Sequence, residues 1–296
     1  MVRIPKHRVR FDFDPRAVPC AEAESGEVVS FSCQDCYSGQ IAYDGFPFSQ
    51  VDMARNNPAT GPLYIRNALP GDILRVEILG IELEDSGCMT AREGVGTYEI
   101  KGTHCRVFPL ENGYGLFDRG IRVPLRPMVG VAGTAPAAGS VSTQEPGRHG
   151  GNLDIKDLGE GAILYLPVEV EGALLSMGDI HAVQGDGETV ICALEVPGTV
   201  RVRIDVLKGR NDIPLPFILT PDKYISIAAD PSLDICSVKA ARIMHGFLSS
   251  HSGLSPEQCG MLLSLAGNLR ISQIVNPLKG CVMEFPRGLA GESFQA

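Results

Sequence analysis

Glycine and proline occur along the whole chain, and their distribution restricts the possible folds more than any other feature of the sequence. The 296 residues include 34 Gly and 21 Pro. Both residues favour tight turns and interrupt regular elements, so this spread is typical of many short strands joined by turns. Aromatic residues make up 6% and Trp is absent, which predicts a core built mainly from aliphatic side chains.

Several segments alternate between apolar and polar residues, as expected for strands with one buried face. The segments 72–79 and 199–206 are the clearest examples. Each predicts a strand with one face in the core and the other in water. Residues 163–170 predict a third strand, and Pro167 within it suggests an edge position or a bend.

Helix signals are concentrated near the C-terminus. Residues 230–232 predict the beginning of a helix over 233–249. Its apolar face is expected to contain Ile235, Val238, Ala241, Ile243 and Phe247. A second helix is expected to begin at Ser255-Pro256-Glu257 and to end near Gly267-Asn268.

These elements predict an α+β protein that is mostly β, with a helical hairpin near the C-terminus and no βαβ alternation. We expect a single domain over 1–296, with two interlocked β lobes over about 1–135 and 150–296 as an alternative. The segment 131–151 is rich in Gly, Ala, Ser, Thr and Pro. It is either a flexible linker or a loop that lines a site.

Charge and cysteine content exclude several classes of partner. The formal net charge is −9, which argues against a nucleic-acid partner. The sequence has no apolar signal region and no apolar run of 18 residues, so we expect a cytoplasmic protein that does not span a membrane. The nine Cys follow no regular spacing, which predicts reduced thiols and no disulfide framework.

The segment 172–188 combines glycines with an unusual density of polar side chains. Within ten residues it contains Asp179, His181, Gln184, Asp186 and Glu188. Asp179 and His181 are two residues apart and point the same way on an extended segment, as two ligands of one ion must. Asp154, about 25 residues earlier, could supply a third ligand. The pattern therefore predicts a cation site.

The type of cation and the existence of the site both have alternatives. Carboxylate with imidazole suits Zn²⁺ or another first-row divalent metal, whereas an all-oxygen set suits Ca²⁺ or Mg²⁺. In the simpler interpretation, the acidic side chains bond to turn backbone and His181 is a hydrogen-bonded, half-buried residue. The joint density of titratable side chains favours a site.

The same block, with much of the rest of the chain, resembles the acetamidase/formamidase family. The matching pieces are Gly150-Gly151-Asn152-Leu153-Asp154, Leu164-Tyr165-Leu166-Pro167-Val168, Glu171-Gly172-Ala173-Leu174, Gly178-Asp179, His181 and Gln184-Gly185-Asp186-Gly187-Glu188. The pieces 60–64, 70–72 and 269–275 agree in order. The sequence departs from the family pattern at Asn268 and at Cys33 and Cys36, which flank Asp35.

This resemblance implies a β-rich fold peculiar to the family, a divalent metal, and hydrolysis of small formamide- or acetamide-like amides. Amide hydrolysis needs a nucleophile, stabilisation of the oxyanion and a proton for the leaving amine. We expect zinc, with calcium as the alternative. The expected metal ligands are Asp35, Asp154, Asp179 and His181. The expected catalytic acid/base is Glu188 or Asp186, and the expected substrate-binding residues are Asn152 and Gln184.

Other interpretations lead to different tests. His104 is a weaker ligand candidate than His181, and Cys33 and Cys36 are expected to be structural thiols because no second pair completes four ligands. The chain could be a non-enzymatic protein that binds Ca²⁺ or a polar metabolite, or a hydrolase of another small C–N substrate. We also expect a homo-oligomer, most simply a dimer.

Overall fold

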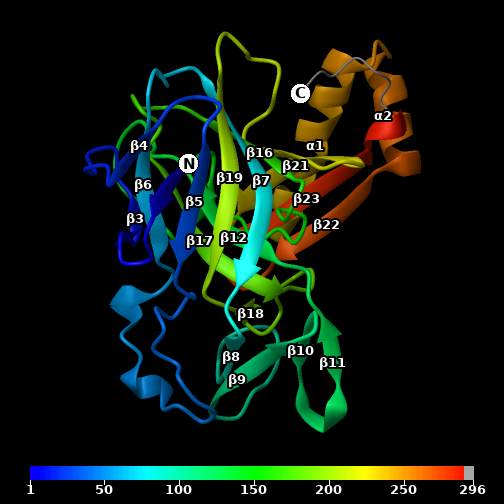
Figure 1. Ribbon diagram of the computed structural model, residues 1–296. Coiled ribbons are helices and arrows are strands. Elements are labelled where there is room, and N and C mark those ends of the chain that lie inside the picture. Colours follow the sequence, from blue (N-terminus) through cyan, green and yellow to red (C-terminus); the bar gives the residue numbers. More distant parts are fainter. Residues whose placement is uncertain (290–296) are drawn as a thin grey trace.

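The computed structural model describes residues 1–289, and these fold into two large β-sheets and a pair of helices (Figure 1). Within these residues the nine-stranded sheet has the order β1 (Val2–Ile4), β5 (Val28–Cys33), β19 (Gly198–Leu207), β7 (Ile73–Leu83), β16 (Ile163–Pro167), β20 (Phe217–Leu219), β21 (Lys223–Asp230), β23 (Lys279–Pro286) and β22 (Asn268–Gln273).

The second sheet, of twelve strands within the same described residues, carries most of the polar block. Its main path is β11 (Arg122–Pro124), β10 (Tyr114–Leu116), β9 (Thr103–Glu111), β8 (Ser86–Arg92), β18 (Leu194–Glu195), β17 (Leu175–Val183), β12 (Met128–Gly133), β15 (Gly150–Asn152) and β14 (Pro146–Gly147). Strand β6 (Ala59–Ile65) branches from β17 and also pairs with β2 (Val9–Arg10) and β4 (Ala21–Ala23).

The smaller elements complete the chain. Strands β3 (Asp12–Phe13) and β13 (Val141–Ser142) pair separately. The helices are α1 (Leu233–His251) and α2 (Pro256–Ala266), and short 3₁₀ turns lie at Phe48–Gln50, Met53–Arg55, Asp118–Gly120 and Arg287–Leu289. The mostly β fold with two late helices is therefore confirmed.

The two predicted alternating strands are neighbours in the nine-stranded sheet. They form β7 and β19, which pair antiparallel with Val76 opposite Ile204, both buried. The third predicted strand, β16, ends at Pro167. It lies between β7 and β20, so the expected edge position was wrong; Pro167 is tolerated because it is the last residue of the strand.

Both helices begin as predicted. Ser232 caps α1 by accepting from the Ile235 amide, and Ser255 with Gln258 forms a capping box at α2. The predicted apolar face of α1 was right for Phe247, which is buried, and for Ile243, which packs against the core, but wrong for Ile235 and Val238, which are exposed. The buried face follows an i, i+4 series rotated from the predicted one, and it contains Cys236, Ala240, Met244, Phe247 and Leu248. This face packs against β21 and β23 (Figure 1).

The glycine-rich segment 131–151 is buried at both ends, over 131–135 and 149–151, and exposed in its middle, over 137–140. It contains the end of β12, the whole of β13 and β14, and most of β15. A Cβ on Gly150 would stand 2.2 Å from the Ala132 carbonyl oxygen, and one on Gly151 would stand 2.1 Å from that of Glu145. Glycine is needed there because the backbones approach too closely for any side chain.

The nine-stranded sheet mixes strands from both halves of the chain, since β5, β19 and β7 are adjacent. The division into two lobes stays a prediction, as does the dimer. Among residues 1–289, none of the helices has the length and apolar character needed to cross a bilayer.

Candidate active site

Strand β17 brings Asp179 and His181 together in the interior. The strand lies between β12 and β18, and both side chains are buried. His181 Nε2 is 3.4 Å from Asp179 Oδ1. The prediction that these two side chains point the same way is confirmed.

Glu195 on β18 is the third member of this group. It stands opposite His181 in the antiparallel pair, and its Oε2 atom is 3.2 Å from His181 Nε2. Its other oxygen accepts a hydrogen bond from the Ala193 amide at 2.9 Å. Burial raises the pKa of Glu195 to about 8, although the neighbouring His181 opposes this shift.

The tautomer of His181 is set by Gln184. The Gln184 side-chain nitrogen donates to the backbone oxygens of Asp154 and Ser272, at 2.9 and 3.2 Å. Its side-chain oxygen therefore faces His181 Nδ1, at 2.8 Å, and can only accept. His181 Nδ1 must carry a proton, which leaves Nε2 directed at the two carboxylates.

Asp154 and Glu188 form a second acidic pair beside this group. One oxygen of each and a ring nitrogen of His181 lie within 4.8 Å of one another. Asn276 Nδ2 donates to Asp154 Oδ2 at 3.3 Å. Burial and, next, the charge of Asp179 raise the pKa of Asp154 to about 7, while burial and Asp154 raise the pKa of Glu188 well above its usual value. The pair therefore retains a proton near neutral pH.

Three acidic residues of the site have a left-handed backbone that glycine normally adopts. The φ angles are 46° for Asp154, 54° for Asp179 and 47° for Glu188. Such conformations cost on the order of 1–3 kcal/mol each in a non-glycine residue and are held only where the surroundings impose them. Their occurrence at one place indicates that the carboxylates are positioned for a function.

Four buried atoms of the group have no hydrogen-bond partner among the described residues. They are Asp154 Oδ1, Asp179 Oδ1, His181 Nε2 and Glu195 Oε2. Buried polar atoms are nearly always satisfied, so four in one place need an explanation. The absence of a side chain at Gly130 leaves room for two of the carboxylates. A Cβ there would lie 2.6 Å from Asp179 Oδ2 and 2.9 Å from Asp154 Oδ1. This donor set suits a divalent cation.

These observations agree with the comparison with known proteins. The model of the Acetamidase/Formamidase family matches residues 6–143 and 130–287. The chain belongs to this family. The crystal structure of an acetamidase from Bacillus halodurans is 42% identical, covers 99% of this chain and 100% of that one, and has a TM-score of 0.96.

Two curated members of the acetamidase/formamidase family are more distant in sequence. A putative formamidase of Schizosaccharomyces pombe is 30% identical over 271 aligned positions, covering 66% of this chain and 64% of the relative. A formamidase of Methylophilus methylotrophus is 26% identical, covering 68% and 66%. The matched region thus spans just under two thirds of the length of these curated relatives.

Two other residues predicted for the site, Asp35 and Asp186, bond to neighbouring protein groups. Asp35 accepts hydrogen bonds from the amides of Tyr37 and Gly39, at 2.8 and 3.1 Å, so it closes a turn. Asp186 forms ion pairs with Lys156 and Arg270, at 2.6 and 2.8 Å.

The other three candidates also have defined contacts. The Gln184 side chain bonds to His181 and to the backbone oxygens of Asp154 and Ser272, so its role in substrate binding stays a prediction. Asn152 is buried and accepts from Asn57 Nδ2 at 3.2 Å. His104 is exposed, and its ring nitrogen Nε2 donates to the Lys101 carbonyl oxygen at 2.9 Å.

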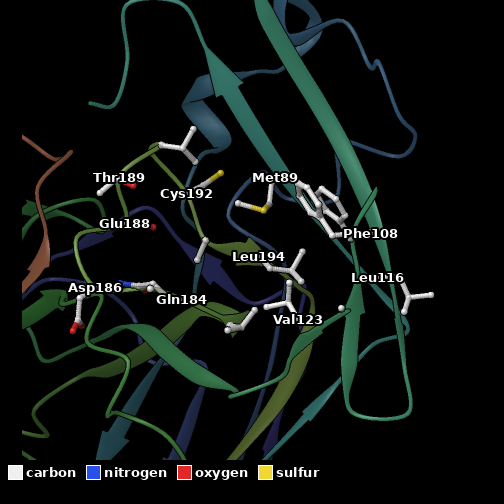
Figure 2. A pocket seen from close by; sticks show the side chains of 16 residues that line it. Met89, Phe108, Leu116, Val123, Gln184, Asp186, Glu188, Thr189, Cys192 and Leu194 are labelled. Atoms are coloured by element: carbon white, nitrogen blue, oxygen red, sulfur yellow. The ribbon is translucent and has the colours of Figure 1, made fainter. Parts of the chain in front are cut away.

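Two cavities meet at the segment 188–192. The polar one has a volume of about 100 Å³, and its lining includes Asp154, Asp179, Glu195 and Asn152. The other, of about 330 Å³, is lined mostly by apolar side chains such as Met89, Phe108 and Leu194 (Figure 2). Glu188 and Cys192 line both.

Sequence reasoning missed Glu195 and Cys36. Glu195 is an isolated carboxylate between the apolar residues Leu194 and Val196, and a lone acid in an apolar strand is the signal that could have identified it. The Cys36 sulfur atom and one oxygen each of Asp179 and Glu195 lie within 4.8 Å of one another. The signal for Cys36 in the sequence was that it departs from the family pattern beside Asp35.

Proposed function

We propose that this protein hydrolyses the C–N bond of small linear amides, such as formamide or acetamide, to a carboxylate and ammonia. We further propose that Asp179, His181 and Glu195 bind a divalent cation required for this activity. The observation that carries the proposal is that one buried atom of each of these side chains lacks a hydrogen bond and faces the others.

The spacing of these atoms fits zinc. The distances from His181 Nε2 are 3.2 Å to Glu195 Oε2 and 3.4 Å to Asp179 Oδ1. Two ligand atoms of a tetrahedral zinc ion stand about 3.4 Å apart when the bonds are about 2.1 Å long. Calcium prefers six to eight oxygen ligands, so the imidazole nitrogen favours zinc. A bound cation of this kind lowers the pKa of a water molecule and polarises a carbonyl group.

The protein's own residues supply the proton chemistry. Asp154 and Glu188 hold a proton between them because burial and mutual repulsion disfavour two charges. Glu188 also lines the polar cavity, where it can deliver this proton to the departing nitrogen. We therefore assign the acid/base role to Glu188, with Asp154 as its partner, and not to Asp186, which is held in ion pairs.

The cavity sets the size and orientation of the substrate. A volume of about 100 Å³ accommodates an amide of a few heavy atoms. Asn152 and Asn57 both line it, and the Asn57 side-chain oxygen is buried without a hydrogen-bond partner among the described residues. That oxygen is suited to accept from the NH₂ group of an amide substrate.

The experiment combines elemental analysis with a substrate panel. Purified protein is assayed for ammonia release from formamide, acetamide and larger linear and cyclic amides, before and after chelation and zinc repletion. We expect hydrolysis of the two smallest amides, loss on chelation and recovery with zinc. Cation binding without hydrolysis of any amide would instead support the non-enzymatic alternative, and preference for a cyclic amide would support a different C–N substrate.

A further inference from the structure

The cysteine beside the proposed cation is held by a rigid turn. The Asp35 carboxylate accepts from the amides of Tyr37 and Gly39, and the Asn57 amide donates to the Cys36 carbonyl oxygen at 2.6 Å. These contacts fix the backbone on both sides of Cys36. Asp35 was predicted to be a metal ligand, but its carboxylate instead holds the turn that contains Cys36.

The Cys36 thiol differs from those of Cys33 and Cys192, and, unlike Cys88 in the same apolar cluster, it lines the polar cavity. Cys33 Sγ contacts the carbonyl oxygens of Phe31 and Met177, each at 3.5 Å, and Cys192 Sγ contacts that of Thr90 at 3.4 Å. Cys36 Sγ has no hydrogen-bond partner among residues 1–289, although the residue is buried. It lines the polar cavity together with Asp179 and Glu195.

We propose that Cys36 binds the cation through its sulfur atom, which gives the centre a mixed nitrogen, oxygen and sulfur donor set. Its sulfur and one oxygen each of Asp179 and Glu195 lie within 4.8 Å of one another. Asp179 Oδ1 and Glu195 Oε2 are also buried without hydrogen bonds in the described chain, so the group contains independent unsatisfied atoms directed at a cation. This inference rests on the cation centre of the proposed function.

Sulfur ligation has a chemical cost and a chemical consequence. The thiol loses its proton to solvent as the S–metal bond forms, so cation binding releases one proton from Cys36. A thiolate selects zinc-like cations over calcium and magnesium, which prefer oxygen. With Cys36 included, the chain would offer the cation one sulfur, one nitrogen and two oxygen atoms.

The test is cobalt substitution of the metal-free protein. Thiolate bonded to Co²⁺ gives an intense near-ultraviolet charge-transfer band that nitrogen and oxygen ligands do not give. We expect this band at one equivalent of Co²⁺ in the natural protein and in the matched control Cys33→Ser. In Cys36→Ser we expect the band to disappear while one equivalent of Co²⁺ still binds.

A second measurement needs no variant and so does not depend on whether Cys36→Ser folds. X-ray absorption of the zinc-loaded natural protein should show one sulfur neighbour at about 2.3 Å. Stoichiometric Co²⁺ or zinc binding without a sulfur neighbour would overturn the role of Cys36 and leave the proposed amidase untouched. Failure to bind either cation would overturn the cation centre itself.

Discussion

His181 Nδ1 lies 2.8 Å from the Gln184 side-chain oxygen, and this contact determines what the other imidazole nitrogen can do. Because the Gln184 nitrogen is fixed by two carbonyl oxygens, its oxygen cannot turn away. We predict that Gln184→Ala lowers cation affinity by about 10–100-fold, the range for losing the outer partner of a histidine ligand. Competition with a chromophoric chelator measures the affinity. Gln144→Ala, which removes a side chain that lines the polar cavity, should leave it unchanged.

His181 itself should be indispensable for the cation. His181→Asn removes the nitrogen ligand, so we expect loss of stoichiometric zinc and a fall in kcat/KM of more than about 100-fold, beyond the loss of an outer partner. Elemental analysis and ammonia release measure the two effects. His104→Asn, at an exposed position, is the control and should retain both. Full zinc content in His181→Asn would be inconsistent with the proposed ligand set.

Glu188 and Asp186 can be distinguished by amide substitutions that keep the side-chain shape. Glu188→Gln should lower kcat by about 10²–10⁴-fold, the contribution of a general acid/base, without reducing zinc content. Asp186→Asn breaks ion pairs with Lys156 and Arg270 and should lower stability with little effect on kcat. Equal losses of kcat in the two variants would refute the assignment to Glu188.

Gly130 tests whether the carboxylates must stay where they are. A Cβ there would stand 2.6 Å from Asp179 Oδ2, so Gly130→Ala should displace the carboxylate and weaken cation binding. We expect destabilisation of about 1–3 kcal/mol, the usual effect of overpacking. Gly185→Ala is the matched control, since a Cβ at Gly185 meets nothing within 4 Å. Denaturant unfolding with cation titration compares the two variants, and similar behaviour of both would argue against the prediction.

The sequence supported predictions that depend on local spacing. Alternation located β7 and β19, capping residues located both helix starts, and the two-residue separation of Asp179 and His181 placed both side chains together. Part of the apolar face of α1 was assigned wrongly because several apolar residues of the helix, such as Ile235, are exposed, and composition does not reveal which stripe meets the sheet.

The rest of the site depends on contacts between distant segments. Glu195 reaches His181 only through the register of β17 with β18. The Gln184 side chain donates a hydrogen bond to the Ser272 carbonyl oxygen. The Asp186 carboxylate forms an ion pair with Arg270, which lies 84 residues later in the chain. A single sequence contains no signal for such pairings. The local density of polar residues therefore could not decide whether Glu188 or Asp186 is the acid/base.

The most direct test of the cation-dependent amidase is stoichiometric reconstitution. Metal-free protein is titrated with zinc while ammonia release from formamide is followed. We predict no activity before zinc, a linear rise with bound zinc, and a plateau at one zinc per chain. Full hydrolysis of formamide by protein that contains no metal, with no change on adding zinc, would contradict the account.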